Sequence, residues 1–183
     1  MKWFYRKNTF SPRGTDSELG EMYYGEDQYG SIYYPNVSTC TTVTVLLGDN
    51  RMLGAHFDKI ASATDIGNVV ARMNTDRGTR AVKELCIVGV LKYASAGGWM
   101  TDDAYRWPKL FDTFSKALGH TGAINGYLQP LGTEKHYRVT SASGVTIWFA
   151  KDVPMLAKGS GTSSASLAES RSVAWDALTL TKW

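Results

Sequence analysis

A β-hairpin signal in the first third of the chain constrains the fold more than any other feature. The run Thr41–Leu47 is rich in β-branched residues, Gly48–Asn50 are turn residues, and Arg51–Phe57 form a second strand-like run. Two such runs divided by turn residues predict an antiparallel hairpin. With the turn centred on residues 48–50, position 40 pairs near position 57 or 58. We therefore expect Cys40 and His56 to be near neighbours at one end of a sheet.

Two helices and a central strand are predicted after the hairpin. In the segment 62–74, apolar residues recur at helical spacing, and Ser62 or Thr64 is a suitable N-cap. Residues 83–93 form a continuous apolar run, which is typical of a central strand buried on both faces. The apolar stripe of 107–118 ends at a glycine and predicts a second helix.

The two ends of the chain complete the expected architecture. Residues 1–36 contain short candidate strands near 21–24 and 31–34. The runs 134–142 and 145–152 predict a second hairpin, 158–172 is a Gly/Ser-rich loop, and 173–183 is expected to be one last strand. This order indicates an α+β fold, an α/β sandwich with a mixed, mainly antiparallel sheet flanked by two main helices. We expect one domain over 1–183, with 1–36 as an N-terminal extension packed on the same core.

Charge and hydropathy exclude several classes of protein. The 20 Lys and Arg residues against 17 Asp and Glu give a net charge of +3, and they are scattered, so we expect no nucleic-acid partner. The N-terminus lacks the apolar core of a cleaved signal, and no stretch is long and apolar enough to span a membrane. We expect cytoplasmic synthesis without a signal peptide, with any secretion or injection by another route.

The two cysteines have different surroundings in the sequence. Cys86 lies in the apolar run "LCIVGVL" and is expected to be a buried thiol, whereas Cys40 lies among hydroxyl-bearing residues and is expected to be available for chemistry. A Cys40–Cys86 disulfide stays open at this point, although it would be unusual in a reducing cytosol.

A thiol beside an imidazole can perform nucleophilic catalysis. His56 would take the proton of Cys40, and the thiolate would attack a carbonyl or carboxamide carbon. Backbone N–H groups around Ser38 and Thr39 are the natural oxyanion donors, and a backbone carbonyl is one candidate to orient the imidazole. The alternative is that Cys40 and His56 are ordinary buried residues of a hairpin.

Other candidate sites are weaker. His120 is interpreted as a solvent-facing neighbour of a helix C-terminus, and His136 as part of a sheet face. The spacing of Cys40 and the histidines matches no zinc site, so no metal is expected. Nucleotide-binding glycine motifs and the G-x-S-x-G motif are missing from the sequence, and Asp102 and Asp103 are interpreted as surface charges near a helix start.

The stretch "STCTT", followed by two strands and His56, resembles the catalytic region of the bacterial glutamine deamidases. These are the proteins related to cytotoxic necrotizing factor, the CheD chemoreceptor deamidase and a bacterial lethal factor of the same fold, which the tail "SVAWDALTLT" also resembles. The resemblance is concrete over Ser38–Asp58 and architectural elsewhere. One departure is Thr39, which stands where the family often has glycine before the cysteine.

The resemblance implies a cofactor-free Cys40–His56 pair that hydrolyses a glutamine side chain of a target protein to glutamate and ammonia. In that family a hydroxyl or main-chain oxygen upstream orients the histidine, and the matching position here is Tyr34. The implied protein is a monomeric bacterial toxin or effector with a protein substrate that presents an accessible glutamine. The alternatives are a non-catalytic interaction protein of the same fold, a Cys–His protease or acyltransferase, and an aromatic-rich carbohydrate-binding module.

Overall fold

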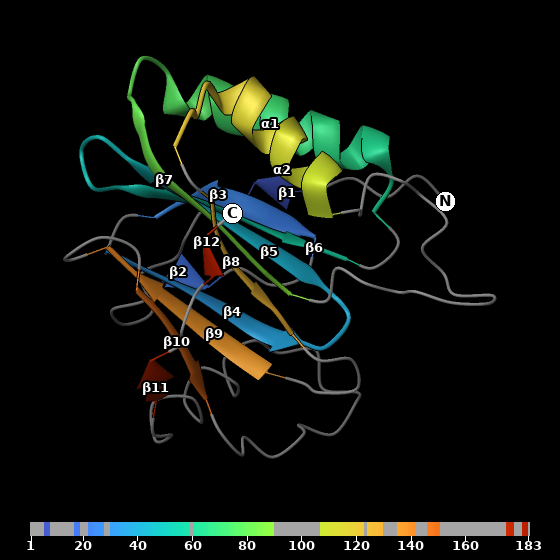
Figure 1. Ribbon diagram of the computed structural model, residues 1–183, viewed down its shortest axis with the longest axis vertical. Coiled ribbons are helices and arrows are strands. Elements are labelled where there is room, and N and C mark those ends of the chain that lie inside the picture. Colours follow the sequence, from blue (N-terminus) through green and yellow to red (C-terminus); the bar gives the residue numbers. More distant parts are fainter. Residues whose placement is uncertain are drawn as a thin grey trace.

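In a computed structural model, the described part of the chain forms two β-sheets and two helices (Figure 1). The structure describes residues 6–7, 17–18, 22–27, 30–58, 61–89, 107–122, 124–129, 135–141, 146–150, 175–177 and 181–182. Within this part of the chain, a seven-stranded sheet has the order β1-β3-β6-β5-β7-β8-β12, and a five-stranded sheet has the order β11-β10-β9-β4-β2. The α+β class and the mixed, mainly antiparallel pairing agree with the prediction.

The predicted hairpin forms the centre of the seven-stranded sheet. It consists of β5 (Thr41–Leu47) and β6 (Met52–Phe57), which pair antiparallel. On its far side β5 pairs with β7 (Val82–Gly89), the predicted central strand, which is buried from Leu85 to Gly89. On the other side β6 pairs with β3 (Tyr23–Glu26), which pairs with the short β1 (Arg6–Lys7).

The smaller sheet is built from both halves of the chain. Its middle strand is β9 (Lys135–Thr140), which pairs antiparallel with β4 (Ser31–Val37). The predicted second hairpin is present, because β9 pairs antiparallel with β10 (Thr146–Ala150). The short β2 (Ser17–Glu18) completes the other edge beside β4.

Both helices lie on the same face of the larger sheet, as Figure 1 shows. The helix α1 (Ala63–Arg77) begins after the N-cap Ser62, and α2 (Trp107–Leu118) has the predicted bounds. An apolar core fills the space between the helices and this sheet. Its large members are Leu53, Phe57, Ile66, Met73 and Phe114.

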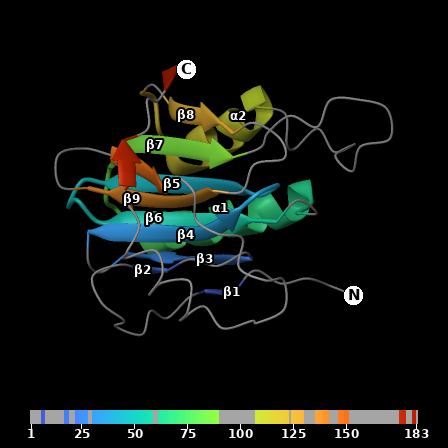
Figure 2. The same cartoon turned by 90° about the horizontal axis from the view of Figure 1, so that it is seen from below.

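A second core lies between the two sheets and contains several polar groups. Figures 1 and 2 show that β4 and β9 lie over β5 and β6 and run roughly along them, on the side away from α1. The apolar side chains of this inter-sheet core come from both sheets. They are Ile32, Tyr34, Val37, Cys40, Leu46, Met52, Cys86, Val88, Tyr137 and Val139.

Two features differ from the prediction. The tail forms two short strands in place of one: β11 (Trp175–Ala177) pairs with β10 in the small sheet, and β12 (Thr181–Lys182) pairs with β8 in the large one. The strand β8 (Ile124–Leu128) was not predicted, because its sequence "INGYL" contains Asn and Gly, which have low strand propensity. It is held by parallel pairing with β7. The Gly/Ser-rich stretch 158–172 lies outside the described residues.

Candidate active site

The candidate nucleophile lies where the chain crosses from one sheet to the other. Strand β4 ends at Val37 in the small sheet, and β5 begins at Thr41 in the large sheet. Residues 38–40, here called the crossover, make this connection in three residues. Cys40 is the last residue before β5, as predicted, and Ser38 and Thr39 are half-buried.

The hairpin register places Cys40 and His56 on the same face of the larger sheet. Thr41 pairs with Phe57 and Thr42 with His56, so position 40 falls opposite position 58, within the predicted range. Because side chains alternate along a strand, those at 40, 42 and 56 share one face. Cys40 and His56 are therefore diagonal neighbours across the pair, a relation that brings Cα atoms to about 7–8 Å.

Both residues are more buried than the sequence suggested. Cys40 is 3% exposed and His56 is 1% exposed, and both face the inter-sheet core. The expectation that the thiol is openly accessible is therefore wrong for this conformation. The reason is the second sheet, because β4 and β9 cover the face of the hairpin that carries both side chains.

Tyr34 approaches His56 from the opposite sheet. The two rings meet edge to face, with centroids 6.0 Å apart and planes at 84°. The Tyr34 hydroxyl donates to the carbonyl oxygen of Val43 at 3.1 Å and lies 2.8 Å from Oγ1 of Thr44. Burial raises the pKa of Tyr34, so the hydroxyl stays protonated. The side chain at this position, and not only its main chain, thus contacts the candidate base.

Thr42 is the cross-strand partner of His56, so its side chain is on the face of the sheet that carries the imidazole. Thr42 Oγ1 donates to the carbonyl oxygen of Val88 at 3.1 Å. Within the described part of the chain, the Nε2 atom of His56 is buried and makes no hydrogen bond, while the ring itself contacts Tyr34. The imidazole therefore lies in a polar part of an otherwise apolar core.

A β-bulge just before the crossover sets which side chains point inward. Tyr34 pairs with Tyr137, but Val37 pairs with Lys135, so β4 has one extra residue in this interval. Asn36 occupies it with a φ of 54°. The extra residue turns both Tyr34 and Val37 toward the inter-sheet core. Thr39 is not among the described residues with positive φ, so the departure from glycine at this position requires no left-handed backbone.

Gly89 packs against the backbone of Cys40. A Cβ atom at Gly89 would lie 2.4 Å from the Cys40 carbonyl oxygen and 2.8 Å from the Cα of Thr41. The φ of Gly89 is +147°, a backbone conformation that residues other than glycine rarely adopt. An isolated glycine within a predicted strand signals such a close approach, and this signal is present in the apolar run of β7.

Gln129 is a buried polar residue that sequence analysis missed. It follows β8 and is 2% exposed. Its Nε2 donates to the Val37 carbonyl oxygen at 2.8 Å, and its Oε1 accepts from the Tyr137 hydroxyl at 2.6 Å. Its backbone N–H donates to the Gly89 carbonyl oxygen at 2.9 Å. The sequence "YLQPLG" gives no pattern that would identify this role.

The second thiol is separated from the first. Cys86 pairs with Thr44, four residues along β5 from Cys40. At about 3.4 Å per residue this offset alone separates the two Cα atoms by about 14 Å, whereas a disulfide needs less than about 7 Å. Neither cysteine is in a disulfide, so the pairing left open by the sequence does not form. Burial, with a smaller contribution from the charge of Glu84, raises the pKa of the Cys86 thiol.

The other two histidines, His120 and His136, lie outside the β5–β6 hairpin that carries His56. His120 is 7% exposed, so its predicted solvent-facing position is wrong. Its N–H caps α2 by donating to the Ser115 carbonyl oxygen at 2.9 Å, and its ring packs against Gly122. His136 lies in β9, in line with a place in a sheet. Among the described residues, no group of three or more His, Cys, Asp or Glu side chains is arranged to hold a metal ion.

Comparisons with known proteins do not assign the site. No protein-family model matches the chain, and no curated protein matches it. In the described residues, neither helix has the length and apolar character needed to cross a membrane.

Proposed function

We propose that the chain is a protein-glutamine deamidase that uses Cys40 as nucleophile and His56 as general base. The observation that supports this proposal is the position of the two side chains. They share one face of the β5–β6 hairpin, at the strand end where the crossover joins the two sheets. The resemblance of residues 38–58 to glutamine deamidases gives the same pair the same roles.

The proposed reaction proceeds through a thioester. His56 takes the proton from Cys40, and the sulfur attacks the carboxamide carbon of a glutamine side chain. The C–N bond then breaks, and the histidine returns the proton to the leaving ammonia. Water activated by His56 cleaves the thioester, which releases glutamate and regenerates the thiol. Backbone N–H groups of Ser38, Thr39 and Cys40 would stabilise the oxyanion.

The burial of Cys40 adds a requirement to this mechanism. A thiol that is 3% exposed can meet a protein side chain only after its covering moves. The crossover is the segment that carries the thiol, and Ser38 and Thr39 within it are half-buried. We propose that a displacement of Ser38 and Thr39, between Val37 and Thr41, which stay in their sheets, admits the substrate glutamine, in line with the loop motions that gate many enzymes.

The proposal includes the partner and the setting of the reaction. The substrate is a protein with an accessible glutamine, the enzyme acts as a monomer without a cofactor, and no nucleic acid takes part. We propose a bacterial toxin or effector that acts after secretion or injection into a host cell.

Thiol labelling gives the first test. If His56 activates Cys40, iodoacetamide should modify Cys40 faster than Cys86 at neutral pH, because Cys86 is buried with a raised pKa. The His56→Gln variant should label Cys40 more slowly than the wild type, with circular dichroism to verify that the variant is folded. Equally slow modification of both cysteines, unchanged by the variant, would refute the activated pair.

Peptide mass spectrometry gives the second test. A protein extract is incubated with the wild type or with Cys40→Ala, and the mass gain that accompanies conversion of glutamine to glutamate is mapped. Sites that appear only with the wild type support deamidation. New chain ends in place of converted glutamines would instead indicate the protease alternative, and a mass gain on lysine side chains an acyltransferase.

A second candidate is a non-catalytic interaction protein of the same fold. The exposures of Cys40 and His56, 3% and 1%, favour it, because ordinary core residues are buried in this way. This candidate predicts slow labelling of both thiols and no converted glutamines. Binding partners would then be retained equally by the wild type and by Cys40→Ala.

A further inference from the structure

Gln129 connects the two backbone segments that flank Cys40. Its side chain donates to the carbonyl oxygen of Val37, the last residue before the crossover, at 2.8 Å. Its backbone N–H donates at 2.9 Å to the carbonyl oxygen of Gly89, which pairs with the residue after Cys40. Gln129 is therefore bonded both to the residue before the crossover and to the β7 residue that pairs with Thr41, the residue after the crossover.

The orientation of the Gln129 side chain is fixed by its partners. A backbone carbonyl oxygen can only accept, so the amide nitrogen must face Val37. The amide oxygen then accepts from the Tyr137 hydroxyl at 2.6 Å. Burial raises the pKa of Tyr137, so this hydroxyl remains a donor. With 2% of the residue exposed, water has little access to replace either bond.

We propose that Gln129 is a positioning residue that fixes the crossover, and with it the backbone N–H groups and the sulfur of Cys40, relative to β7. This inference rests on the proposed function for its catalytic meaning. Gln129 acts on the backbone beside Cys40 and takes no part in the transfer of protons. Its loss should therefore lower kcat and leave substrate binding nearly unchanged, because misplacement of a catalytic group by about 1 Å costs up to about 100-fold in rate.

Three variants separate the contributions of the two side-chain bonds. Gln129→Met removes both bonds at similar size, and Tyr137→Phe removes only the Tyr137 bond. Gln129→Glu is the conservative variant, because a carboxyl that burial keeps protonated can donate to Val37 and accept from Tyr137. If the bond to Val37 positions the crossover, Gln129→Met should lower kcat for ammonia release from carbobenzoxy-glutaminylglycine by about 10- to 100-fold, and Gln129→Glu should lower it less. KM should change less than kcat, and Tyr137→Phe should have the smallest effect.

Hydrogen exchange tests the positioning role without any enzymatic activity. Amides of residues 38–41 should exchange faster in Gln129→Met than in the wild type, while those of α1 should not change. Unchanged exchange at 38–41, or an unchanged kcat in an active enzyme, would overturn the proposal. If the wild type has no deamidase activity, the proposed function fails, and a local rise in exchange still identifies Gln129 as the residue that holds the crossover. Should Gln129→Met unfold, the milder Tyr137→Phe must show a smaller rise at 38–41, because it removes one of the two contacts that orient the amide, and no rise would overturn the proposal.

Discussion

At the scale of single residues, Gly89 is a position in the candidate site that leaves no room for a side chain. The Cys40 carbonyl oxygen lies where a Cβ would have to be, and the φ of +147° adds strain for any other residue. The glycine therefore permits the close contact between β7 and the backbone that carries the thiol. A side chain at this position would push the backbone of Cys40 and Thr41 away from β7.

Replacement of Gly89 by alanine should destabilise the protein by at least about 2 kcal/mol, because backbone atoms of β5 and not a flexible side chain would have to move. Urea unfolding of Gly89→Ala against the wild type measures this loss. The matched control is Gly67→Ala in α1, where a Cβ meets nothing within 4 Å. This control should stabilise the helix by about 0.5–1 kcal/mol. Equal effects of the two substitutions would contradict the packing argument.

The residues of the candidate site differ in how far the sequence could predict them. The register of Cys40 against His56 followed from the position of the turn, because the strand period is fixed at two residues. The contact of the Tyr34 ring with His56 could not be predicted, because it depends on how one sheet lies on the other. The same holds for Gln129, whose partners Val37 and Tyr137 belong to the opposite sheet.

At the scale of elements, α1 shows how a local sequence signal sets a helix boundary. The N-cap is Ser62, whose Oγ accepts from the Asp65 N–H at 3.2 Å, while the Asp65 carboxylate accepts from the Ser62 N–H at 2.9 Å. This reciprocal capping box decides between the two N-caps that the sequence allowed. Thr64 is an exposed residue of the first turn.

Replacement of Ser62 by alanine should lower the free energy of unfolding by about 1 kcal/mol, because the Asp65 N–H loses its acceptor. Ser62→Gly should cost only a few tenths of a kcal/mol by the same scale. Thr64→Ala is the matched control on the exposed face and should change stability by less than about 0.5 kcal/mol. Thermal unfolding followed by circular dichroism at 222 nm compares the three. A larger loss for Thr64→Ala than for Ser62→Ala would show that the cap is misassigned.

Elements with strong local signals were predicted well, and those held by pairing alone were not. The hairpin β5–β6 and the helix α2 have the expected bounds because turn residues and an apolar stripe define them. Strand β8 lacks such a signal, since it contains Asn125 and Gly126, and its neighbours β7 and β12 keep it extended. The tail was expected to be one strand. Its division between two sheets depends on the tertiary arrangement, which no local pattern encodes.

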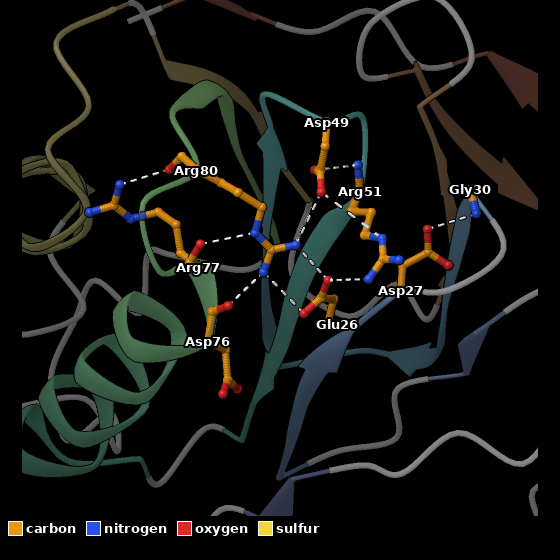
Figure 3. A network of polar contacts seen from close by, with 8 residues as sticks. All are labelled: Glu26, Asp27, Gly30, Asp49, Arg51, Asp76, Arg77 and Arg80. Atoms are coloured by element: carbon orange, nitrogen blue, oxygen red, sulfur yellow. Dashed lines mark hydrogen bonds and ion pairs between the residues drawn. The ribbon is translucent and has the colours of Figure 1, made fainter.

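At the scale of the whole molecule, a polar network joins β3 and the turn of the β5–β6 hairpin to the end of α1 (Figure 3). Arg80 makes a bidentate ion pair with Glu26 of β3, at 2.6 and 3.2 Å, and reaches Asp49 of the hairpin turn at 3.3 Å. It also donates to the carbonyl oxygens of Asp76 and Arg77 at the end of α1, at 2.5 and 2.9 Å. One guanidinium thus joins a strand, a turn and a helix at the end of the hairpin opposite Cys40.

This network should make stability depend on pH in the acid range. The hydrogen bond from Arg80 lowers the pKa of Glu26 below its ordinary value of 4.5. A carboxylate with a lowered folded-state pKa stabilises the fold above the unfolded value and loses that contribution as the pH falls through the folded value. Glu26→Gln should therefore cost about 1–2 kcal/mol at pH 7, and the difference from the wild type should shrink below pH 4.5.

The control for this prediction is the exposed pair of Lys116 and Asp112 on α2, at 3.3 Å, whose side chains are 80% and 68% exposed. Asp112→Asn should change stability by less than about 0.5 kcal/mol, because solvent screens this pair. Urea unfolding at a series of pH values between 3 and 7 measures both variants. A constant difference between Glu26→Gln and the wild type over that range would contradict the assigned role of Arg80.

The distance between the two thiols has a consequence for the chemistry of oxidants. A peroxide that reached the sulfur of Cys40 would convert it to a sulfenic acid, and proteins that survive this step reversibly need a second thiol close by to condense with it. Cys86 pairs with Thr44, four residues along β5 from Cys40, so the Cys86 thiol is too far from Cys40 to form that disulfide. Repair would have to come from a small thiol such as glutathione entering from solution, and without it the sulfur would proceed to the irreversible sulfinic acid.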